Sequence, residues 1–569
     1  MDDLFLVCLG GSGSKILEAV AHMAALNLWE EATLHLLIVD VDGGNGNMQR
    51  AVRTVEYYEK VRKMEVDCGQ TCKLFRSEMK LHTWTPTPPD INLSMMEKNV
   101  TDESSLLGRF LFTEDERVMG TENGFKGHPN IGVLFMQSII SNRNEQTKDG
   151  LEDFIAEALH IQPDRILLAG SCYGGTGASC IPILGRYLRS RLGDKIAMGL
   201  LVMLPSFSLI KDSELAIDPD SREFPDRVKT VLSTYISEDI LEYRPQATRG
   251  TDTLPMYEKI YLLGSPEPIP FPQYAAGHSL QQNPATFFDW FACMAIRDYQ
   301  MSGTPKECNV YTAWMSQGPW NWNRFDPKLC RQLEMKANKL MIAAGLYLSE
   351  IHGPMGSRLN APNRKHPNWL SLYFQNVPVT DQQLLSTQMS NFAEYVAMVV
   401  LWFYQIVMYL PGRLFPDMTN ERFDCGLSPE QMEKKVEKLQ LSLTGEEQKS
   451  LFMLYYQQFF NPVALLHMEK LRQRFWPDGN TRDGKTEDEH ENVIRAFQQI
   501  VRDGWGADEE KTLGVLLCCI TRNRYYPNAT ADQLMGRIYE NRVYTGNSDD
   551  AVPALLRRMF AMIDSMARG

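Results

Sequence analysis

The chain has 569 residues, 44% of them hydrophobic, which is enough for more than one buried core. Its 71 acidic residues outnumber its 58 basic ones and give a net charge of −13, which argues against broad nucleic-acid binding because that needs a positive surface. The eleven cysteines show no regular spacing and no signal peptide is recognised, so we expect reduced thiols in a cytoplasmic protein.

Strand-like and helix-like segments alternate up to about residue 300. The first apolar run, Leu4–Leu9, is followed by a glycine-rich turn and a helical stretch from Ser14 to about Leu26. Further runs typical of buried strands are Leu34–Val39, Arg165–Ala169, Ile196–Leu204 and Lys259–Gly264. This alternation predicts an α/β fold with a mostly parallel sheet that helices cover on both faces.

Long helical patterns replace the alternation in the second half of the chain. We therefore predict a first domain over 1–282, a central helix over 283–300, and a second domain with a largely helical C-terminal extension over 301–569. The proline-rich stretch Thr83–Asp90 predicts a surface loop. The most apolar window, Tyr395–Leu410, is shorter than the roughly 20 apolar residues of a membrane span, so it predicts a buried helix and no membrane span.

The first glycine-rich turn is CLGGSGSK, Cys8–Lys15, where a buried strand turns into a helix. Its glycines, Gly10, Gly11 and Gly13, let the backbone approach a ligand closely. The helix that follows directs free N–H groups and its positive dipole end to the same point. The turn therefore predicts an anion site, with a tight packing turn as the alternative. It lacks a Walker lysine, and the third glycine of the dinucleotide fingerprint falls at Ile16.

A second loop of the same kind lies in RILLAGSCYGGTGASC, from Arg165 to Cys180. Pro182 is predicted in the first turn of the helix that follows, where a missing N–H costs nothing. Two such loops at the carboxyl ends of strands in one sheet predict a polyphosphate held between them. The glycines and hydroxyl donors of this loop are Gly170, Ser171, Gly174, Gly175, Thr176, Gly177 and Ser179.

Five motifs, in order, resemble a known superfamily. YGGTGAS (Tyr173–Ser179) resembles the G-G-G-T-G-[ST]-G signature of tubulin and FtsZ, which also follows a strand. GGSGSK is similar to the first phosphate loop of that superfamily, and VDVDGG (Val39–Gly44) stands where its second loop is expected. GFKGHPNIG (Gly124–Gly132) resembles the third loop, and QNPATFFDWFACMAIRDYQ (Gln282–Gln300) resembles the central helix. The resemblance covers about residues 1–300 and is strongest to the divergent prokaryotic tubulin-like proteins.

The resemblance implies a tubulin-like GTPase domain with GTP as its ligand. Asp40 or Asp42 would hold Mg²⁺ through water or contact the nucleotide, and Asn283 would hydrogen-bond the base. The segment Leu204–Phe207 is expected near the ribose, with Phe287 beside the base or in the core. The residues implied at the phosphates are Gly10, Gly11, Ser12, Gly13 and Ser14 on one side, Ser171, Gly174, Gly175, Thr176 and Gly177 on the other, and Lys126, Gly127 and His128 near the γ-phosphate.

The sequence departs from the family pattern in the signature loop and in the acidic loop. Tyr173 replaces the first glycine of the signature and Ser179 the last, and Tyr173 adds a ring beside the nucleotide. The family hydrolyses GTP with an acidic loop, N-x-D-x-x-[DE], from the next subunit. No clean copy stands between Asp298 and Asp326, and Asn323–Glu334 has the wrong spacing. GTP binding is thus better supported than hydrolysis, and the chain is expected either to form filaments or to act as a nucleotide-switched scaffold that meets itself or a protein partner through its C-terminal half.

Two alternatives remain open from the residues alone. In a cysteine hydrolase, Cys172 would be the nucleophile of a G-x-C-x-G elbow, with Asp289 and either His278 or His352 as partners. In a dinucleotide-binding protein of the NAD type, the acid after the second strand would bind the ribose. We expect no protein-built metal site, because the pair Cys68–Cys72 has no second pair at zinc spacing.

Overall fold

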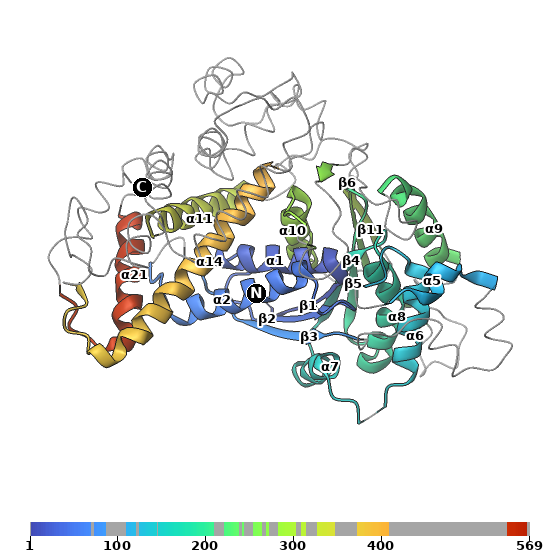
Figure 1. Ribbon diagram of the computed structural model, residues 1–569, viewed down its shortest axis with the longest axis horizontal. Helices are drawn as coiled ribbons and strands as arrows, with labels where there is room; N and C mark the ends of the chain where they lie inside the picture. Colours follow the sequence, from blue (N-terminus) through green and yellow to red (C-terminus); the bar gives the residue numbers. More distant parts are fainter. Residues whose placement is uncertain are drawn as a thin grey trace, which may run out of the picture. The chain divides into compact units, whose positions relative to one another are not determined.

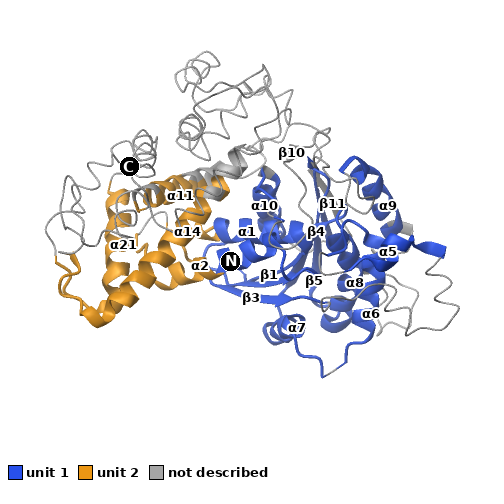
Figure 2. Ribbon diagram, in the orientation of Figure 1, with its two compact units in different colours: residues 1–23, 29–55, 77–317 blue, residues 24–28, 56–76, 318–569 orange. Residues whose placement is uncertain are grey.

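The computed structural model of the chain describes residues 2–69, 73–86, 110–120, 124–144, 146–209, 221–237, 242–243, 254–264, 269–271, 281, 283–302, 309–313, 327–347, 373–408 and 543–565 (Figure 1). The chain divides into two compact units, each of which is described by itself (Figure 2). Unit 1 takes residues 1–23, 29–55 and 77–317, and unit 2 takes residues 24–28, 56–76 and 318–569.

Within its described residues, unit 1 is built around a seven-stranded sheet in the order β11-β9-β5-β4-β1-β2-β3. Every neighbouring pair is parallel, which confirms the predicted α/β fold with its mostly parallel sheet. Three of the strands are buried along their whole length, as unbroken apolar runs predict. The strands are β1 (Leu4–Leu9), β2 (Leu34–Val39), β3 (Met79–Trp84), β4 (Arg165–Ser171), β5 (Ala197–Met203), β9 (Lys259–Leu263) and β11 (Asn309–Ala313).

Helices cover both faces of this sheet (Figure 1). On one face, alternate strand residues such as Phe5, Val7 and Leu168 share a core with α6, α7 and α8. On the other face, Tyr299 of α10 packs so closely on Gly199 of β5 that a Cβ there would lie 2.6 Å from its ring. The helices that lie wholly or mostly in unit 1 are α1 (Gly10–Ala25), α2 (Gly46–Lys63), α5 (Glu114–Val118), α6 (Pro129–Ser141), α7 (Gly150–Ile161), α8 (Gly175–Leu192), α9 (Phe224–Ser237) and α10 (Phe287–Met301). The last residues of α1, from 24 on, and of α2, from 56 on, belong to unit 2.

The sheet extends beyond the strands that the sequence predicts. Thr83 and Trp84 belong to β3, so the predicted loop over Thr83–Asp90 is wrong at its first two residues; residues 87–90 lie outside the described part. Trp84 pairs with Val39 of β2 and is buried. The centroid of its ring lies 5.1 Å from the guanidinium carbon of Arg143. Burial of this ring favours the extension of β3 as far as Trp84.

Pro182 lies inside α8 and not in its first turn, because the helix begins at Gly175. A proline has no N–H, so the carbonyl four residues earlier loses its helical donor. That carbonyl belongs to Ala178, and it accepts the hydroxyl hydrogen of Tyr235 from α9 at 2.6 Å. The tyrosine replaces the missing donor, which is why the helix continues through the proline.

Unit 2 is helical in the part that the structure describes, as predicted for the C-terminal region. Its helices are α11 (Pro327–Leu346), α14 (Gln382–Met408) and α21 (Ser548–Asp564). Residues 395–408 of the apolar window lie in α14, and residues 409 and 410 lie outside the described part. Tyr395 is buried against Phe75, with ring centroids 5.4 Å apart. None of the helices described here is long and apolar enough to cross a membrane.

A buried lysine joins distant segments of unit 2. Lys339 of α11 is fully buried, and its Nζ lies 2.8 Å from a carboxylate oxygen of Asp67 and 2.8 Å from one of Asp564 in α21. A buried charge is stable only when it is paired and hydrogen-bonded, so the two carboxylates together make this position tolerable.

Candidate functional site

The first glycine loop passes directly into a helix, since α1 begins at Gly10 and not near Ser14. Gly10 has a φ of 67°, a left-handed conformation that glycine adopts without strain. A Cβ on Gly13 would lie 2.6 Å from the carbonyl carbon of Cys8, so this glycine lets α1 pack against β1. Ser14 is buried and donates its hydroxyl hydrogen to the carbonyl of Gly10 at 3.0 Å. The helix-opening part of the loop is therefore used for packing.

The second glycine loop connects the end of β4 to the start of α8. The N-cap of α8 is Gly174, which has no side chain to bond the free N–H groups of the first turn. Gly175 follows, and a Cβ there would lie 2.6 Å from the Cβ of Phe125. The absence of a side chain thus serves a close approach of two backbones, and the uncapped N–H groups remain available to an anion.

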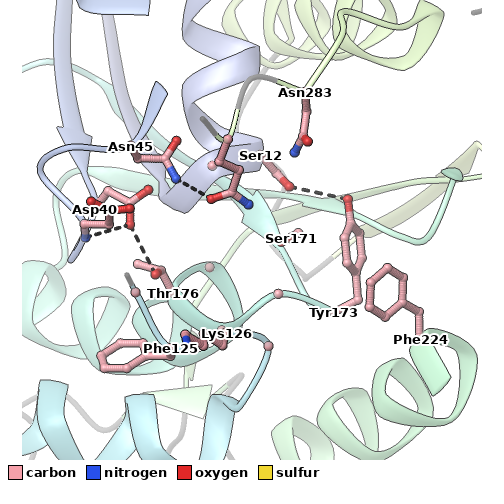
Figure 3. Close-up of a pocket in the computed structure, with 18 of the residues that line it drawn as sticks. Ser12, Asp40, Asn45, Phe125, Lys126, Ser171, Tyr173, Thr176, Phe224 and Asn283 are labelled. Carbon is pink, nitrogen blue, oxygen red and sulfur yellow. Dashed lines mark hydrogen bonds between the residues drawn. The ribbon is translucent and has the colours of Figure 1, made fainter. Parts of the chain in front are cut away.

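The two loops meet at the carboxyl ends of β1 and β4, which are neighbours in the sheet. A Cβ on Gly10 would lie 3.1 Å from the backbone nitrogen of Gly177. The hydroxyl oxygens of Ser12 and Tyr173 are 3.4 Å apart (Figure 3). Residues of both loops line one pocket.

A third loop, residues 124–127, forms another wall of this pocket. Gly124, Lys126 and Gly127 all have left-handed backbones, with φ values of 70°, 42° and 78°. Arg227 of α9 fixes the loop by donating to the carbonyl of Gly127 at 2.7 Å. Among the described residues that line the pocket, Lys126 is the one cation. The loop therefore adds a positive charge to the lining of the pocket.

Two buried carboxylates lie at one end of the pocket. Asp40 and Asp42 follow β2, and each is 2% exposed. Asp40 accepts hydrogen bonds from the hydroxyl of Thr176 at 3.3 Å and from the N–H of Asp42 at 3.4 Å. Burial is the main cause that raises the pKa of Asp40 to about 7, and the negative charge of Asp42 is the second. A cation bound beside these oxygens would relieve the repulsion between them.

Amide and aromatic side chains line the pocket elsewhere. The Asn45 amide donates to the side-chain oxygen of Gln281 at 2.7 Å, and Asn283 lies nearby. The ring of Tyr173 packs against Phe224 with centroids 5.1 Å apart. Figure 3 shows Asp40 on one side of the pocket and Tyr173 with Phe224 on the other. The pocket therefore offers charged groups in one part and flat apolar or amide surfaces in another.

Most residues that the sequence predicts for the site line this pocket. Those that do are Gly11, Ser12, Asp40, Asp42, Lys126, Gly127, Ser171, Tyr173, Gly174, Gly175, Thr176, Gly177 and Asn283. Those outside the lining are Gly10, Gly13 and Ser14, which pack the start of α1. His128 is also outside the lining, and its Nδ1 lies 3.1 Å from a carboxylate oxygen of Glu116.

Sequence reasoning missed several residues of the lining, and Phe207 was expected only as the end of a ribose segment. The missed residues are Asn45, Gly124, Phe125, Phe224 and Gln281. A signal existed for Asn45 and Gln281, because they stand within a few residues of Asp42 and Asn283. The side chain of Phe287, at the start of α10, lies outside what the structure describes.

The candidate nucleophile Cys172 is buried and does not line the pocket. Burial raises the pKa of its thiol to about 12, so the reactive thiolate is scarce at neutral pH. Asp289, its proposed acidic partner, is paired with Lys15 at 3.1 Å. His278 and His352 lie outside the described residues. These observations give the nucleophile elbow no support.

The fold and the pocket together define an α/β protein with a polar site at the carboxyl ends of a parallel sheet, where such folds place their ligands. No protein-family model matches the chain, and no curated protein matches it at the threshold of significance. In the described ranges, no group of three or more His, Cys, Asp or Glu side chains is arranged to hold a metal ion; Cys72 lies outside those ranges.

Proposed function

We propose that this chain is a divergent tubulin/FtsZ-like protein that binds GTP in the pocket formed by its glycine loops. The observation that carries the proposal is the convergence of two helix N-termini, those of α1 and α8, on one glycine-lined pocket. Free N–H groups and positive dipole ends favour an oxygen-rich anion. Two such ends, with Lys126 on a third wall, suit a ligand that carries several phosphates.

The chemistry of the pocket suggests how the nucleotide would lie. Its phosphates would meet the N–H groups of Gly11, Ser12 and the first turn of α8. Mg²⁺ would be held through water by Asp40 and Asp42, because hard cations prefer carboxylate oxygens and Mg²⁺ keeps much of its water. The base would lie toward Asn283.

The proposal concerns binding, with hydrolysis left aside because the sequence has no clean acidic loop between Asp298 and Asp326. A bound terminal phosphate would contact the loop of residues 124–127, as in switch proteins that read the presence of a phosphate. We propose that this state is read by a second copy of the chain or by a protein partner through residues 301–569.

The test is nucleotide binding by the purified full chain. Calorimetry with GTP, ATP and NAD should show tight binding of GTP, and light scattering with and without GTP reports assembly. Thr176→Arg places a long side chain in the pocket and should abolish binding with an unchanged circular dichroism spectrum. Thr230→Arg, on the exposed side of α9, is the matched control and should bind GTP normally. Preference for ATP or NAD, or normal binding by Thr176→Arg, would contradict the proposal.

A further inference from the structure

Asn47 connects two parts of the pocket wall that are far apart in sequence. It stands near the start of α2, and 1% of it is exposed. Its backbone N–H donates to the side-chain oxygen of Asn45 at 2.9 Å, which holds the first turn of the helix. Its own side-chain Oδ1 accepts the backbone N–H of Asn283 at 2.7 Å. One buried amide thus fixes the residue that we propose to contact the base.

The other half of this amide is unused. Nδ2 of Asn47 is buried and has no hydrogen-bond acceptor among the residues that the structure describes. Turning the amide around would set its NH₂ group against the N–H of Asn283, so the orientation is fixed by that bond. Buried donors are almost always hydrogen-bonded, and an unpaired one calls for a partner.

This donor lies next to a glycine of the pocket lining, although Asn47 itself is not one of the lining residues. A Cβ built on Gly11 would lie 3.5 Å from Nδ2 of Asn47, and beyond its own helix no other described atom comes within 4 Å of that point. Gly11 lines the pocket. Of the described residues that line the pocket, Gly11 is thus the one that the structure places beside Nδ2, and a ligand oxygen bound there would be a candidate acceptor.

We propose that Asn47 is a ligand-binding residue, whose Nδ2 donates to an oxygen of the bound nucleotide beside Gly11 while its Oδ1 holds Asn283 in place. This inference rests on the proposed nucleotide binding. The acceptor is a phosphate or a ribose oxygen, since both are strong acceptors and both occur in a nucleotide.

The position of Asn283 has a second support. Arg50 of α2 donates to its carbonyl at 2.9 Å, and Arg50 is itself paired with Glu18 of α1 at 2.8 Å. A change at Asn47 therefore leaves one of the two backbone anchors of Asn283 intact. This makes it feasible to alter the ligand contact without losing the whole segment.

Two substitutions separate the roles of the amide. Asn47→Asp has the same shape and keeps an acceptor for the N–H of Asn283, but it replaces the donor with a negative oxygen. Asn47→Ala removes both functions and is small enough to be accommodated. Asn142→Asp, on the exposed C-cap of α6, is the matched control for the added charge.

The experiment is calorimetry on the full chain with GTP and Mg²⁺, ATP and Mg²⁺, tripolyphosphate, and guanosine, with circular dichroism to monitor folding. Asn47→Asp should weaken GTP binding about tenfold or more and keep the wild-type ratio of GTP to ATP affinity. Asn47→Ala should weaken GTP binding and also reduce that ratio. Asn142→Asp should bind as the wild type does.

The remaining arms locate the acceptor and distinguish the ways in which the idea can fail. Weaker binding of tripolyphosphate by the Asn47 variants places the acceptor on a phosphate, and weaker binding of guanosine alone places it on the ribose. Wild-type GTP affinity in folded Asn47→Asp and Asn47→Ala would overturn the role of Asn47 and leave the proposed function standing. Failure of the wild-type chain to bind GTP would overturn both.

Discussion

Two neighbouring glycines of the first loop should respond to alanine in opposite ways. The added methyl of Gly11→Ala would lie 3.5 Å from Nδ2 of Asn47, an ordinary contact, and Gly11 has no left-handed backbone. Alanine favours a helix over glycine by about 0.5–1 kcal/mol, so the fold should be as stable or slightly more stable. The methyl would, however, occupy pocket space beside Asn47, and GTP binding should fall about tenfold or more.

Gly13→Ala should instead damage the fold. Its methyl would lie 2.6 Å from the carbonyl carbon of Cys8 and 3.1 Å from the carbonyl oxygen of Ala169. Both belong to the backbone of central strands, which cannot move apart cheaply, and overpacking of this kind costs about 1–3 kcal/mol or more. After subtracting the helix gain, we expect a net loss of about 2 kcal/mol and a melting temperature lower by about 5 °C.

The assay combines thermal unfolding followed by circular dichroism with GTP calorimetry on both variants. The expected pattern is a stable Gly11→Ala that binds poorly and a Gly13→Ala that melts early. Tight GTP binding by Gly11→Ala would show that the space beside it is not part of the site. An unchanged melting temperature in Gly13→Ala would refute the packing role inferred from its neighbours.

Three further predictions concern unit 1. Tyr235→Phe should cost about 1–3 kcal/mol in denaturant unfolding because a buried carbonyl loses its donor, and Pro182→Ala in the same chain should recover part of this by restoring an N–H; strictly additive effects would contradict the compensation. Partial burial opposes ionisation of Asp149, but its hydrogen bonds from Arg143 outweigh burial and lower its pKa, so this stabilisation is present above about pH 4 and is lost as the pH falls. Arg143→Met should cost roughly 2 kcal/mol, less than for a fully buried pair, and should flatten the acid side of a plot of melting temperature against pH. Because burial raises the pKa of the Cys172 thiol to about 12, iodoacetamide should leave it unmodified in the native chain at pH 8, and rapid labelling in a mass-spectrometric assay would show that the thiol is accessible.

The strands that the sequence predicted well are those whose signal is local. Continuous apolar runs such as Leu4–Leu9 can be buried on both faces only inside a covered sheet, so the pattern and the structure agree. The sequence analysis did not predict β3, because the central residues of this strand are partly or fully exposed at the edge of the sheet and do not form an apolar run. Pro182 was misplaced because the rule for prolines at helix starts is local, whereas the hydroxyl that rescues its interior position comes from Tyr235.

The same distinction applies to the candidate site. The glycine loops were predictable because clustered glycines after a buried strand and before a helix form a local pattern that can be read from the sequence. The sequence could not separate Gly11, which faces the pocket, from Gly13, which makes room for a carbonyl of β4. Phe224 and Gln281 reach the pocket only through the tertiary path of the chain, for which no local pattern exists.

The buried ammonium of Lys339 has a consequence for how the chain is made. One of its counter-ions, Asp67, is synthesised before Lys339, but the other, Asp564, belongs to α21 and follows Lys339 by 225 residues. Until then this buried ammonium has only one of its two carboxylate partners. A chain released before α21 should therefore expose Lys339 to water and loosen unit 2, and α21 is a poor place for a deletion.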